Sequence, residues 1–393
     1  MEYTDEDLPA GVFYYSISAV YKDGQEHLTP YEVKALVFSE GTGEPNDPYQ
    51  IASAEQLVSI ADFPTLTDKN FVLINNIDLD PSLMGEAAFK RSVIPSFAGT
   101  LNGNGFTIGN MTIMSNSHRP VTHCLGLFGT IENGGLVLNL GVVDAKINAQ
   151  GEDIGIIAGH NNGTVSNCYS TGAVSGDSGV GGLVGYNSGS ITMSYSTGTV
   201  SGHQIVGGLV GMNDDSVSNC YSTGVVSGHV GVGGLVGYNH IGSITVSYSA
   251  GTVSGTGYAV GGLAGFNHSS ITMSYSTGSV TGDRSVGGLV GWNTSDRGSI
   301  IASYSTGSVT GDSLVGGLVG RNDESSVMSC FWDMETSRQP TSASGMGLTT
   351  AEMQTESTFT NADWDFINET ENGTEDIWWI DEGQDYPRLW WEQ

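Results

Sequence analysis

Positive charge is scarce in this chain. Of its 393 residues, only 12 are lysine or arginine, against 42 aspartates and glutamates, so the formal net charge is −30. No lysine follows Lys146. Nucleic-acid binding needs clustered basic side chains that displace counterions from the phosphates, so this composition argues against DNA and RNA as partners.

Long apolar segments are also missing. No run of about 18 apolar residues occurs, so the sequence predicts no membrane insertion. The first residues, MEYTDEDLPAG, are acidic and lack the basic and apolar regions of a signal peptide. We therefore expect an excerpt of a longer exported chain.

Proline is absent from residues 121 to 339, and the chain has only four cysteines. Cys168, Cys220 and Cys330 share one slot of a repeat. If each repeat is one coil, the first two lie about 9.6 Å apart, which is beyond disulfide reach. No CxxC motif or partnering histidine cluster accompanies them, so we predict buried thiols, no metal and no cofactor at these residues.

In place of these features the chain has 58 glycines and one pattern written seven times between Ile154 and Cys330. Its clearest copy is VGGLVGYNSGSITMSYSTGTVSG, at residues 180–202, and successive copies lie 26, 26, 26, 28, 26 and 29 residues apart. One asparagine recurs in every copy, at Asn161, Asn187, Asn213, Asn239, Asn267, Asn293 and Asn322. One tyrosine recurs in six copies, at Tyr169, Tyr195, Tyr221, Tyr248, Tyr275 and Tyr304.

A fixed period in this range is the signature of a solenoid or another repeat array. Each copy holds two runs rich in β-branched and aromatic residues, bounded by turn residues, whereas its glycines disfavour helix. The period is too short for a four-stranded propeller blade. We therefore predict an all-β fold, a single-stranded parallel β-helix with coils of about 26 residues, expected to be right-handed and closed by end caps.

Two repeated features suggest local geometry. The glycine pair before each repeated leucine predicts a positive φ or a corner too tight for a Cβ atom. The repeated asparagine predicts a turn residue whose amide bonds to the asparagine one coil away.

The copies GGLVGYN, GGLVGMN, GGLAGFN and GGLVGWN, each followed by SYSTG or CYSTG, resemble the GLUG-motif repeats of bacterial surface and secreted proteins. The resemblance covers all seven copies. It implies a parallel β-helix and an extracellular or cell-surface setting, and it implies little about chemistry, because these repeats also serve as scaffolding.

Outside the repeats we expect a strand pair at the start, Val12–Tyr21 and Tyr31–Val37, which resembles the last two strands of a fibronectin type III module. Ser53 is a predicted N-cap of a short helix. Tryptophan is dense near the end, with five of seven in the last 30 residues. The expected parts are a β remnant at 1–38, a linker and cap at 39–92, the β-helix at 93–330 with regular coils at 154–330, and an aromatic-rich cap at 331–393.

Three groups of residues are candidates for chemistry or binding. Asp214 and Asp215 are an acidic pair inside the regular coils, where a glycosidase would need two carboxylates about 5–10 Å apart. The insertion at 114–124, with His118, Arg119 and His123, is a predicted lateral loop. A platform for stacking sugar rings is an alternative role for four of the C-terminal tryptophans, Trp378, Trp379, Trp390 and Trp391.

A structural Ca²⁺ is a further alternative, since Asn76, Asp78 and Asp80 offer alternating oxygens, although EF-hand spacing is absent. No coil stands out as an active site. We therefore predict a non-enzymatic extracellular scaffold or adhesion module of a larger bacterial surface protein, whose partner is a host or neighbouring-cell surface protein or a polysaccharide. The alternative is a glycan-binding or polysaccharide-degrading β-helix.

Overall fold

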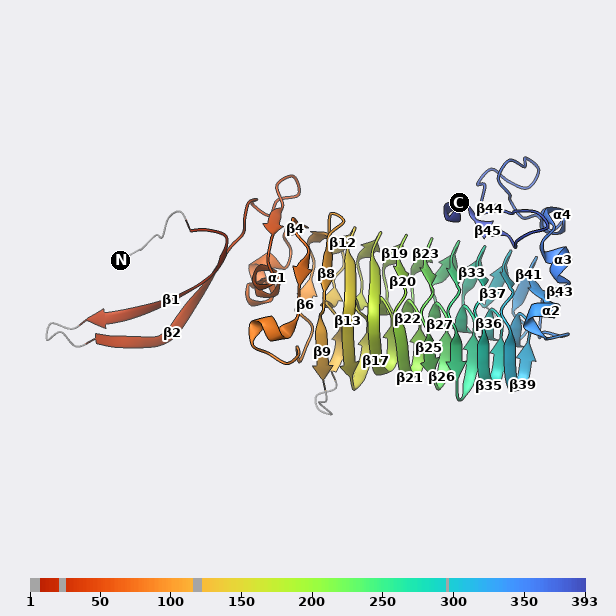
Figure 1. Cartoon of the computed structure of the whole chain (residues 1–393), viewed down its shortest axis with the longest axis horizontal. Helices are drawn as coiled ribbons and strands as arrows, with labels where there is room; N and C mark the ends of the chain where they lie inside the picture. The colour runs from red at the N-terminus through yellow and green to blue at the C-terminus, as the bar shows by residue number, and fades with distance from the viewer. Residues whose placement is uncertain (1–7, 21–25, 116–121, 295–296) are drawn as a thin grey trace.

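The computed structural model describes residues 8–20, 26–115, 122–294 and 297–393. These residues form an elongated parallel β-solenoid with a hairpin projecting from one end and an irregular segment folded back at the other (Figure 1). The predicted all-β parallel β-helix is therefore confirmed. No helix in the described part of the chain is long and apolar enough to cross a membrane.

Three parallel sheets form the solenoid, and each coil from β6 onward contributes strands to all three, whereas β3 and β4 add two earlier strands to the eleven-stranded sheet alone. The nine-stranded sheet consists of β6 (Ile94–Phe97), β11 (Phe128–Ile131), β15 (Ala158–Asn161), β18 (Val184–Asn187), β22 (Val210–Asn213), β27 (Val236–Asn239), β32 (Ala264–Asn267), β36 (Val290–Asn293) and β40 (Val319–Asn322). The eleven-stranded sheet consists of β3 (Tyr49–Ile51), β4 (Asn70–Leu73), β7 (Thr100–Asn102), β12 (Leu136–Leu138), β16 (Thr164–Ser166), β19 (Ser190–Thr192), β23 (Ser216–Ser218), β28 (Ser243–Thr245), β33 (Ser270–Thr272), β37 (Ser299–Ile301) and β41 (Ser326–Met328).

The third sheet has 21 strands, because in most coils this side is split at a bend. Its strands are β5 (Ile77–Asp78), β8 (Thr107–Gly109), β9 (Thr112–Ser115), β10 (Thr122–Leu125), β13 (Gly141–Ala149), β14 (Gly151–Ile154), β17 (Tyr169–Gly181), β20 (Tyr195–Ser196), β21 (Thr199–Gly207), β24 (Tyr221–Ser222), β25 (Val226–Gly228), β26 (Val230–Gly233), β29 (Tyr248–Ser249), β30 (Val253–Gly255), β31 (Tyr258–Gly261), β34 (Tyr275–Ser276), β35 (Val280–Gly287), β38 (Tyr304–Ser305), β39 (Val309–Gly316), β42 (Phe331–Asp333) and β43 (Met346–Leu348).

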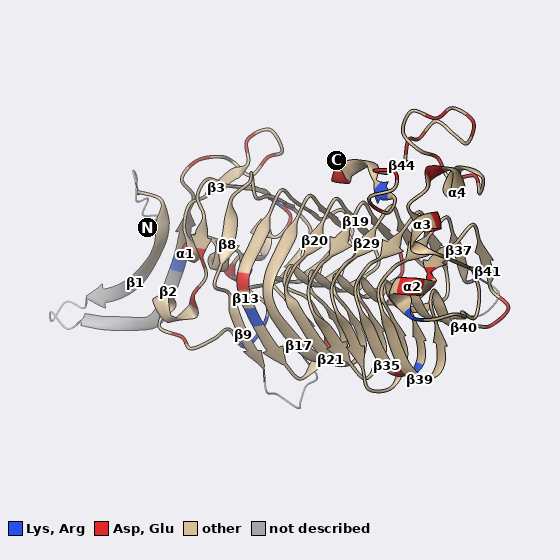
Figure 2. Ribbon diagram, turned by 45° about the vertical axis from the view of Figure 1, so that its right-hand side comes forward, with Lys and Arg blue, Asp and Glu red and all other residues tan. Residues whose placement is uncertain are grey.

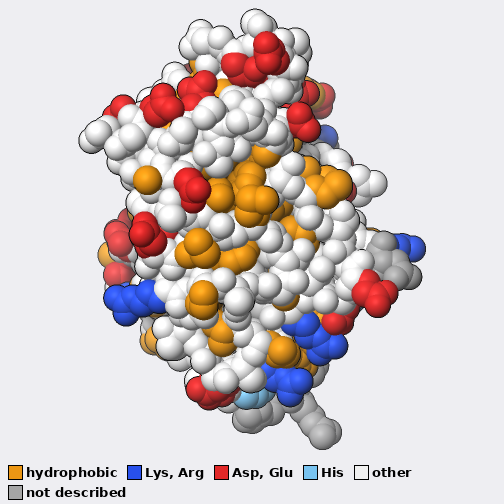
Figure 3. All heavy atoms as spheres, turned by 90° about the vertical axis from the view of Figure 1, so that its right-hand side faces the viewer, with side chains coloured by type: hydrophobic (Ala, Val, Ile, Leu, Met, Phe, Trp, Pro, Cys, Tyr) orange, Lys and Arg blue, Asp and Glu red, His pale blue; other side chains and the backbone are white. Residues whose placement is uncertain are grey.

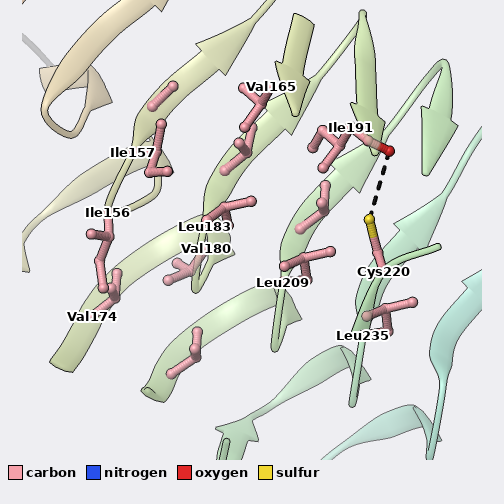
Figure 4. Close-up of a cluster of buried hydrophobic side chains, with 14 of the residues drawn as sticks. Ile156, Ile157, Val165, Val174, Val180, Leu183, Ile191, Leu209, Cys220 and Leu235 are labelled. Carbon is pink, nitrogen blue, oxygen red and sulfur yellow. Dashed lines mark hydrogen bonds between the residues drawn. The ribbon is translucent and has the colours of Figure 1, made fainter. Parts of the chain in front are cut away.

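Identical slots of successive coils stack in register. Val184 pairs with Val210 and Val210 with Val236, so each apolar side chain lies above its equivalent in the previous coil. The close-up in Figure 4 shows the interior this produces, in which Leu183, Leu209 and Leu235 point inward from consecutive coils and are fully buried. No single coil could enclose these side chains, whereas stacked coils bury them together.

Each regular coil also turns at two left-handed corners. One corner slot holds Asn139, Asn167, Met193, Asn219, Val246, Met273, Ala302 and Ser329, all with φ between 47° and 54°. The other holds Cys124, Asp153, Gly179, Ile205, Gly231, Ala259, Ser285 and Leu314, with φ between 52° and 66°. These φ values cost most side chains about 1–2 kcal/mol, so the stacked ladders on both sides must hold the corners in place.

The glycine pair is required by close approach. A Cβ atom on Gly208 would lie 2.1 Å from the carbonyl oxygen of Gly234 and 2.3 Å from the Ser222 hydroxyl. Of the two explanations offered by the sequence, the tight corner is therefore the right one at this position, since φ of Gly208 is not in the left-handed range.

At the N-terminal end, β1 (Gly11–Val20) and β2 (Glu26–Val37) form an antiparallel hairpin, and the second strand starts earlier than predicted. The predicted turn between them lies outside the described residues. Helix α1 (Ala54–Ser59) begins at the predicted N-cap Ser53, whose hydroxyl accepts a hydrogen bond from the Gln56 amide. The hairpin contacts this helix, and it does not by itself show a fibronectin type III module. Three 3-10 turns follow, at Ile60–Asp62, Pro64–Leu66 and Pro81–Met84.

The C-terminal segment is divided between the end and the flank of the solenoid. Strand β43 pairs with β42 and adds a partial last layer, but Met328 and Met346 remain more than half exposed, and apolar side chains are visible in the middle of this end face (Figure 3). Beyond β42 the segment first covers part of the last coil, since the Gly317 amide donates to the Thr341 carbonyl oxygen and the Leu318 and Val319 amides donate to the Ser342 hydroxyl. It then folds back along the flank of the solenoid (Figure 1). Its elements are α2 (Met334–Ser337), α3 (Thr350–Met353), α4 (Glu356–Thr360), β44 (Trp378–Trp379), β45 (Arg388–Leu389) and a 3-10 turn at Trp390–Glu392.

Candidate functional site

The repeated asparagines form a buried amide ladder, as the sequence predicted. The Nδ2 group of each donates to the Oδ1 atom of the asparagine in the next coil, at 2.8–2.9 Å, from Asn161 to Asn322. The asparagines from Asn161 to Asn293 are fully buried, and none has a left-handed φ. This ladder satisfies polar groups inside the solenoid, so its role is structural.

The repeated tyrosines form a second ladder on the flank. Their rings stack face to face from Tyr169 to Tyr304 with centroids 4.6–5.1 Å apart and planes within 9° of parallel. The folded-back C-terminal segment lies on this ladder. Trp391 stacks over Tyr221 and Tyr248, and Glu392 accepts a hydrogen bond from the Tyr275 hydroxyl. A continuous aromatic stripe explains why the later, aromatic part of this segment packs on the flank.

The predicted tryptophan platform is divided by this packing. Trp378 is only 1% exposed and lies in the core beneath the segment, so a sugar ring could not stack on it. Trp379 is half-buried, with its indole nitrogen donating to the Leu389 carbonyl oxygen. Trp390 is the most open of the four, at 48% exposure. For Trp378 the prediction of a glycan contact was wrong, because the side chain holds the segment to the solenoid.

The other predicted site residues have separate partners. Asp78 accepts hydrogen bonds from the Asp80 amide and from Asn110, while Asp80 caps the Ser82 amide. The hydrogen bonds from Ser82 lower the pKa of Asp80, and both bonds to Asp78 go to its Oδ1 atom. The calcium site stays a prediction. In the lateral loop, His118 and Arg119 lie outside the described residues, as does the side chain of His123.

Sequence reasoning missed a row of side chains on the outward face of the nine-stranded sheet. Each comes from the slot before the ladder asparagine or, in the coil that precedes the ladder, before Ile131, which pairs with Asn161, and each is half-buried. We call this set the outward row: Thr130, His160, Tyr186, Met212, Tyr238, Phe266, Trp292 and Arg321. The residue differs from copy to copy, so the repeat pattern did not single it out, although the variation itself was visible in the sequence.

The middle of the outward row contains a hydrogen-bonded cluster. The Tyr186 hydroxyl donates to Asp214 Oδ2 at 2.5 Å, and His240 Nδ1 lies 3.0 Å from Asp214 Oδ1. Burial, together with the hydrogen bond to Asp214, raises the pKa of Tyr186. The neighbouring Asp215 is exposed on the adjoining turn and lines a polar hollow with Ser190. The two acids of the predicted pair therefore have different surroundings.

The far end of the row is aromatic. Phe266 lies 5.5 Å from Tyr238 and 5.8 Å from Trp292, measured between ring centroids, and Tyr258 packs edge-on against Phe266. The Arg321 guanidinium lies 4.1 Å above the Trp292 ring. Together these residues form a strip of rings on a rigid sheet, bordered by polar groups.

Three potential metal ligands converge at the other end of the row. One ligand atom each from Cys124, Asp153 and His160 lies within 4.8 Å of the other two, and all three residues are half-buried. Burial raises the pKa of the Cys124 thiol and lowers the pKa of His160. The sequence prediction considered only cysteines with nearby motif partners. The fold brings His160 next to Cys124 across two coils, which no spacing rule would reveal. The remaining cysteines are buried free thiols, as predicted.

Charge is spread unevenly over the surface. Acidic residues gather on the terminal segments and the turns, whereas long stretches of the coils carry neither acidic nor basic residues (Figure 2). The outward row includes one arginine and no lysine.

Comparison with known proteins identifies the repeats. The model for the GLUG motif matches residues 176–201, 202–227, 256–281 and 282–310. The chain is 34% identical over 148 residues to a halomucin of Haloquadratum walsbyi and 33% identical over 142 residues to a proposed Gly-rich membrane protein of Evansella cellulosilytica. These matches cover 36% and 35% of the chain but only 2% and 16% of the two relatives.

One solved structure is also similar. A proposed immunoglobulin A1 protease from Bacteroides ovatus aligns with a TM-score of 0.49 at 20% identity, over 91% of this chain and 96% of that one. The GLUG motif therefore occurs in four segments of this parallel β-solenoid, between residues 176 and 310.

Proposed function

We propose that this chain is a non-catalytic scaffold and adhesion module of a larger surface protein. The observation that carries the proposal is the unbroken register of the ladders, in which the asparagine and tyrosine slots repeat through the regular coils without a coil set apart for chemistry. Parallel ladders joined coil by coil resist bending, and their length can change by whole repeats.

The relatives support this proposal by their names. A halomucin and a Gly-rich membrane protein are not named as enzymes, and both names fit an extracellular or cell-surface setting on a long exported chain. Within such a chain, the solenoid would hold adhesive surfaces away from the cell. Its partners would be surface proteins or polysaccharides of a host or neighbouring cell.

Stretching single molecules by their two ends tests the scaffold role. A stiff spacer should lengthen little under load until whole coils unravel, and each coil of about 26 residues should then add roughly 85 Å. Regular steps of that size support the proposal. Gradual extension at low force, without steps, would show that the solenoid cannot serve as a stiff spacer.

Glycan binding is a second candidate, favoured by the aromatic end of the outward row. Flat rings at Tyr238, Phe266 and Trp292 offer stacking faces for sugars, and neighbouring carboxylates and histidines offer hydrogen bonds to hydroxyl groups. Tyr258 adds a ring that is 42% exposed. The rigid sheet would keep these groups in place before a ligand arrives.

Affinity electrophoresis in gels containing polysaccharides tests this candidate. The variants Tyr238→Thr and Trp292→Thr take the residue that Thr130 already supplies in the same slot, so the coil should stay intact. Binding at the outward row predicts that both variants lose retardation while Trp390→Ala keeps it. The reverse result would return the binding site to the C-terminal tryptophan, and no retardation of the native chain would remove the glycan candidate.

A further inference from the structure

At one place on the solenoid, potential metal ligands in the second left-handed corner slot lie next to a histidine of the outward row. Cys124 and Asp153 occupy the same left-handed corner slot in adjacent coils, since the residues on either side of them pair in strands β10 and β14. His160 lies in the outward row on β15, in the same coil as Asp153. The three side chains therefore come from three strands of two stacked coils.

Other coils lack this combination. The corner slot elsewhere holds Gly179, Ile205, Gly231, Ala259, Ser285 and Leu314, and the outward row has no second histidine. The corner slot, which elsewhere carries glycine, serine or aliphatic residues, here carries a sulfur and a carboxylate next to the histidine of the outward row. Their coincidence in one place is a local property of these coils and not a feature of the repeat.

We propose that Cys124, Asp153 and His160 form a binding site for Zn²⁺ or a comparable transition-metal ion, with a fourth position open to water. Thiolate, imidazole and carboxylate are the ligands that zinc takes in proteins. Around a tetrahedral zinc ion such ligand atoms lie about 3.3–3.8 Å apart, so atoms already within 4.8 Å of one another need only small side-chain shifts.

An unexplained polar atom supports the site. The Nε2 atom of His160 is buried and has no hydrogen-bond partner among the described residues. The Tyr186 ring packs edge-on against the imidazole at 4.5 Å and limits its movement. A buried ring nitrogen without a partner is costly, and a metal ion would satisfy it.

Mutual convergence distinguishes this site from a catalytic relay. In a nucleophile relay the histidine stands between the thiol and the acid, which are then not neighbours. Here the ligand atoms of Cys124 and Asp153 lie within 4.8 Å of each other as well as of the His160 ligand atom. The three ligand atoms therefore converge on one position, where a metal ion could bind all of them. The proposal is independent of the adhesion role.

Cobalt binding to the metal-free native chain tests the site. Co²⁺ replaces zinc and gives a thiolate-to-cobalt charge-transfer band in the near ultraviolet when a cysteine sulfur is a ligand. We expect a band that saturates at one equivalent and disappears when Zn²⁺ is added. Cys168, Cys220 and Cys330 are at most 3% exposed, so they should not contribute.

The variants use residues that the solenoid already has in each slot. Cys124→Ser copies Ser285 and should abolish the band, while Asp153→Gly copies Gly179, and His160→Thr copies Thr130. The last two should weaken binding about ten-fold or more, since even outer-shell partners of metal ligands typically contribute that much. Cys220→Ser, which copies the serine found in that slot of other coils, is the matched control and should bind like the native chain.

Three outcomes would overturn the proposal: no charge-transfer band with the native chain, a band that survives Cys124→Ser, or equal binding by His160→Thr. Circular dichroism checks that each variant is folded. If Cys124→Ser does not fold, the cobalt binding of His160→Thr decides between the outcomes. If the native chain gave no cobalt band, if Cys124 in the metal-free chain were alkylated rapidly, and if His160→Thr abolished that rapid alkylation, Cys124 would instead be a nucleophile.

Discussion

Replacing one asparagine in the middle of the amide ladder should open the solenoid locally. Asn239 accepts a hydrogen bond from Asn213 at 2.9 Å and donates to Asn267 at 2.8 Å and to the Ser270 carbonyl oxygen at 3.2 Å. In Asn239→Ala all three are lost inside a fully buried row. At about 1 kcal/mol for each bond, plus part of the cost of leaving buried groups unpaired, the loss should be about 3–4 kcal/mol.

Asn322→Ala is the matched control at the end of the same ladder. Asn322 accepts one bond from Asn293 and donates one to the Ser325 carbonyl oxygen, and its side chain is only partly buried. Its loss should be about 1–2 kcal/mol, because water can reach the groups left behind. The interior substitution should therefore be more destabilising by at least about 1 kcal/mol.

Native-state hydrogen exchange is the suitable assay, since a stack of coils need not unfold in a single step. The quantity compared is the free energy of opening of the amides in β27 and β28 for Asn239→Ala, and in β40 and β41 for Asn322→Ala, each against the native chain. Equal losses at both positions would refute the reasoning, because they would show that the buried amide ladder contributes no more than an exposed end.

Three further predictions concern a corner, the flank and the outward row. Gly208→Ala should lower the free energy of unfolding by about 3 kcal/mol, because the new Cβ atom would lie 2.1 Å from a backbone oxygen. In the control Gly109→Ala the nearest atom is 3.6 Å from the new Cβ atom, so the free energy of unfolding should change by less than about 1 kcal/mol. Urea unfolding compares the two variants, and equal effects would contradict the clash. Trp391→Ala removes two ring-stacking contacts with the tyrosine ladder, each contributing about 0.5–1.5 kcal/mol. Limited proteolysis of the last 15 residues should therefore become faster, and an unchanged rate would show that the tyrosine ladder does not hold these residues in place. Burial lowers the pKa of His268, so as the pH drops the imidazole is protonated in the unfolded chain before it is protonated in the folded chain. The free energy of unfolding should therefore fall as the pH drops below about 6.5. His268→Gln should make the free energy of unfolding less dependent on pH, and an unaltered slope would contradict this explanation.

The repeats could be predicted from the sequence because identical residues at a fixed period must stack. The asparagine ladder followed from that argument together with the chemistry of the amide. The N-cap at Ser53 and the capping box of Thr349 and Glu352, which begins α3, depend on neighbouring residues alone. Such local features were therefore accessible without the structure.

The remaining features depend on contacts between distant segments. The C-terminal segment reaches Tyr221, which lies 170 residues before Trp391 in the sequence, and nothing in its composition indicates the flank rather than the end. The outward row and the convergence of Cys124 with His160 occupy slots where the copies differ. A search for repeated residues passes over such slots, although variable positions on a rigid frame are where binding specificity is expected.

The central claim is that the chain is a spacer or binding module that does not cleave polysaccharides. A panel of plant, algal and bacterial polysaccharides tests it most directly. Released sugar ends are counted after long incubation with the native chain and with Asp214→Asn, which removes the charge beside Tyr186 and His240. The account predicts no release above the buffer level for either protein. Release by the native chain that Asp214→Asn abolishes would contradict the account and make the outward row an active site.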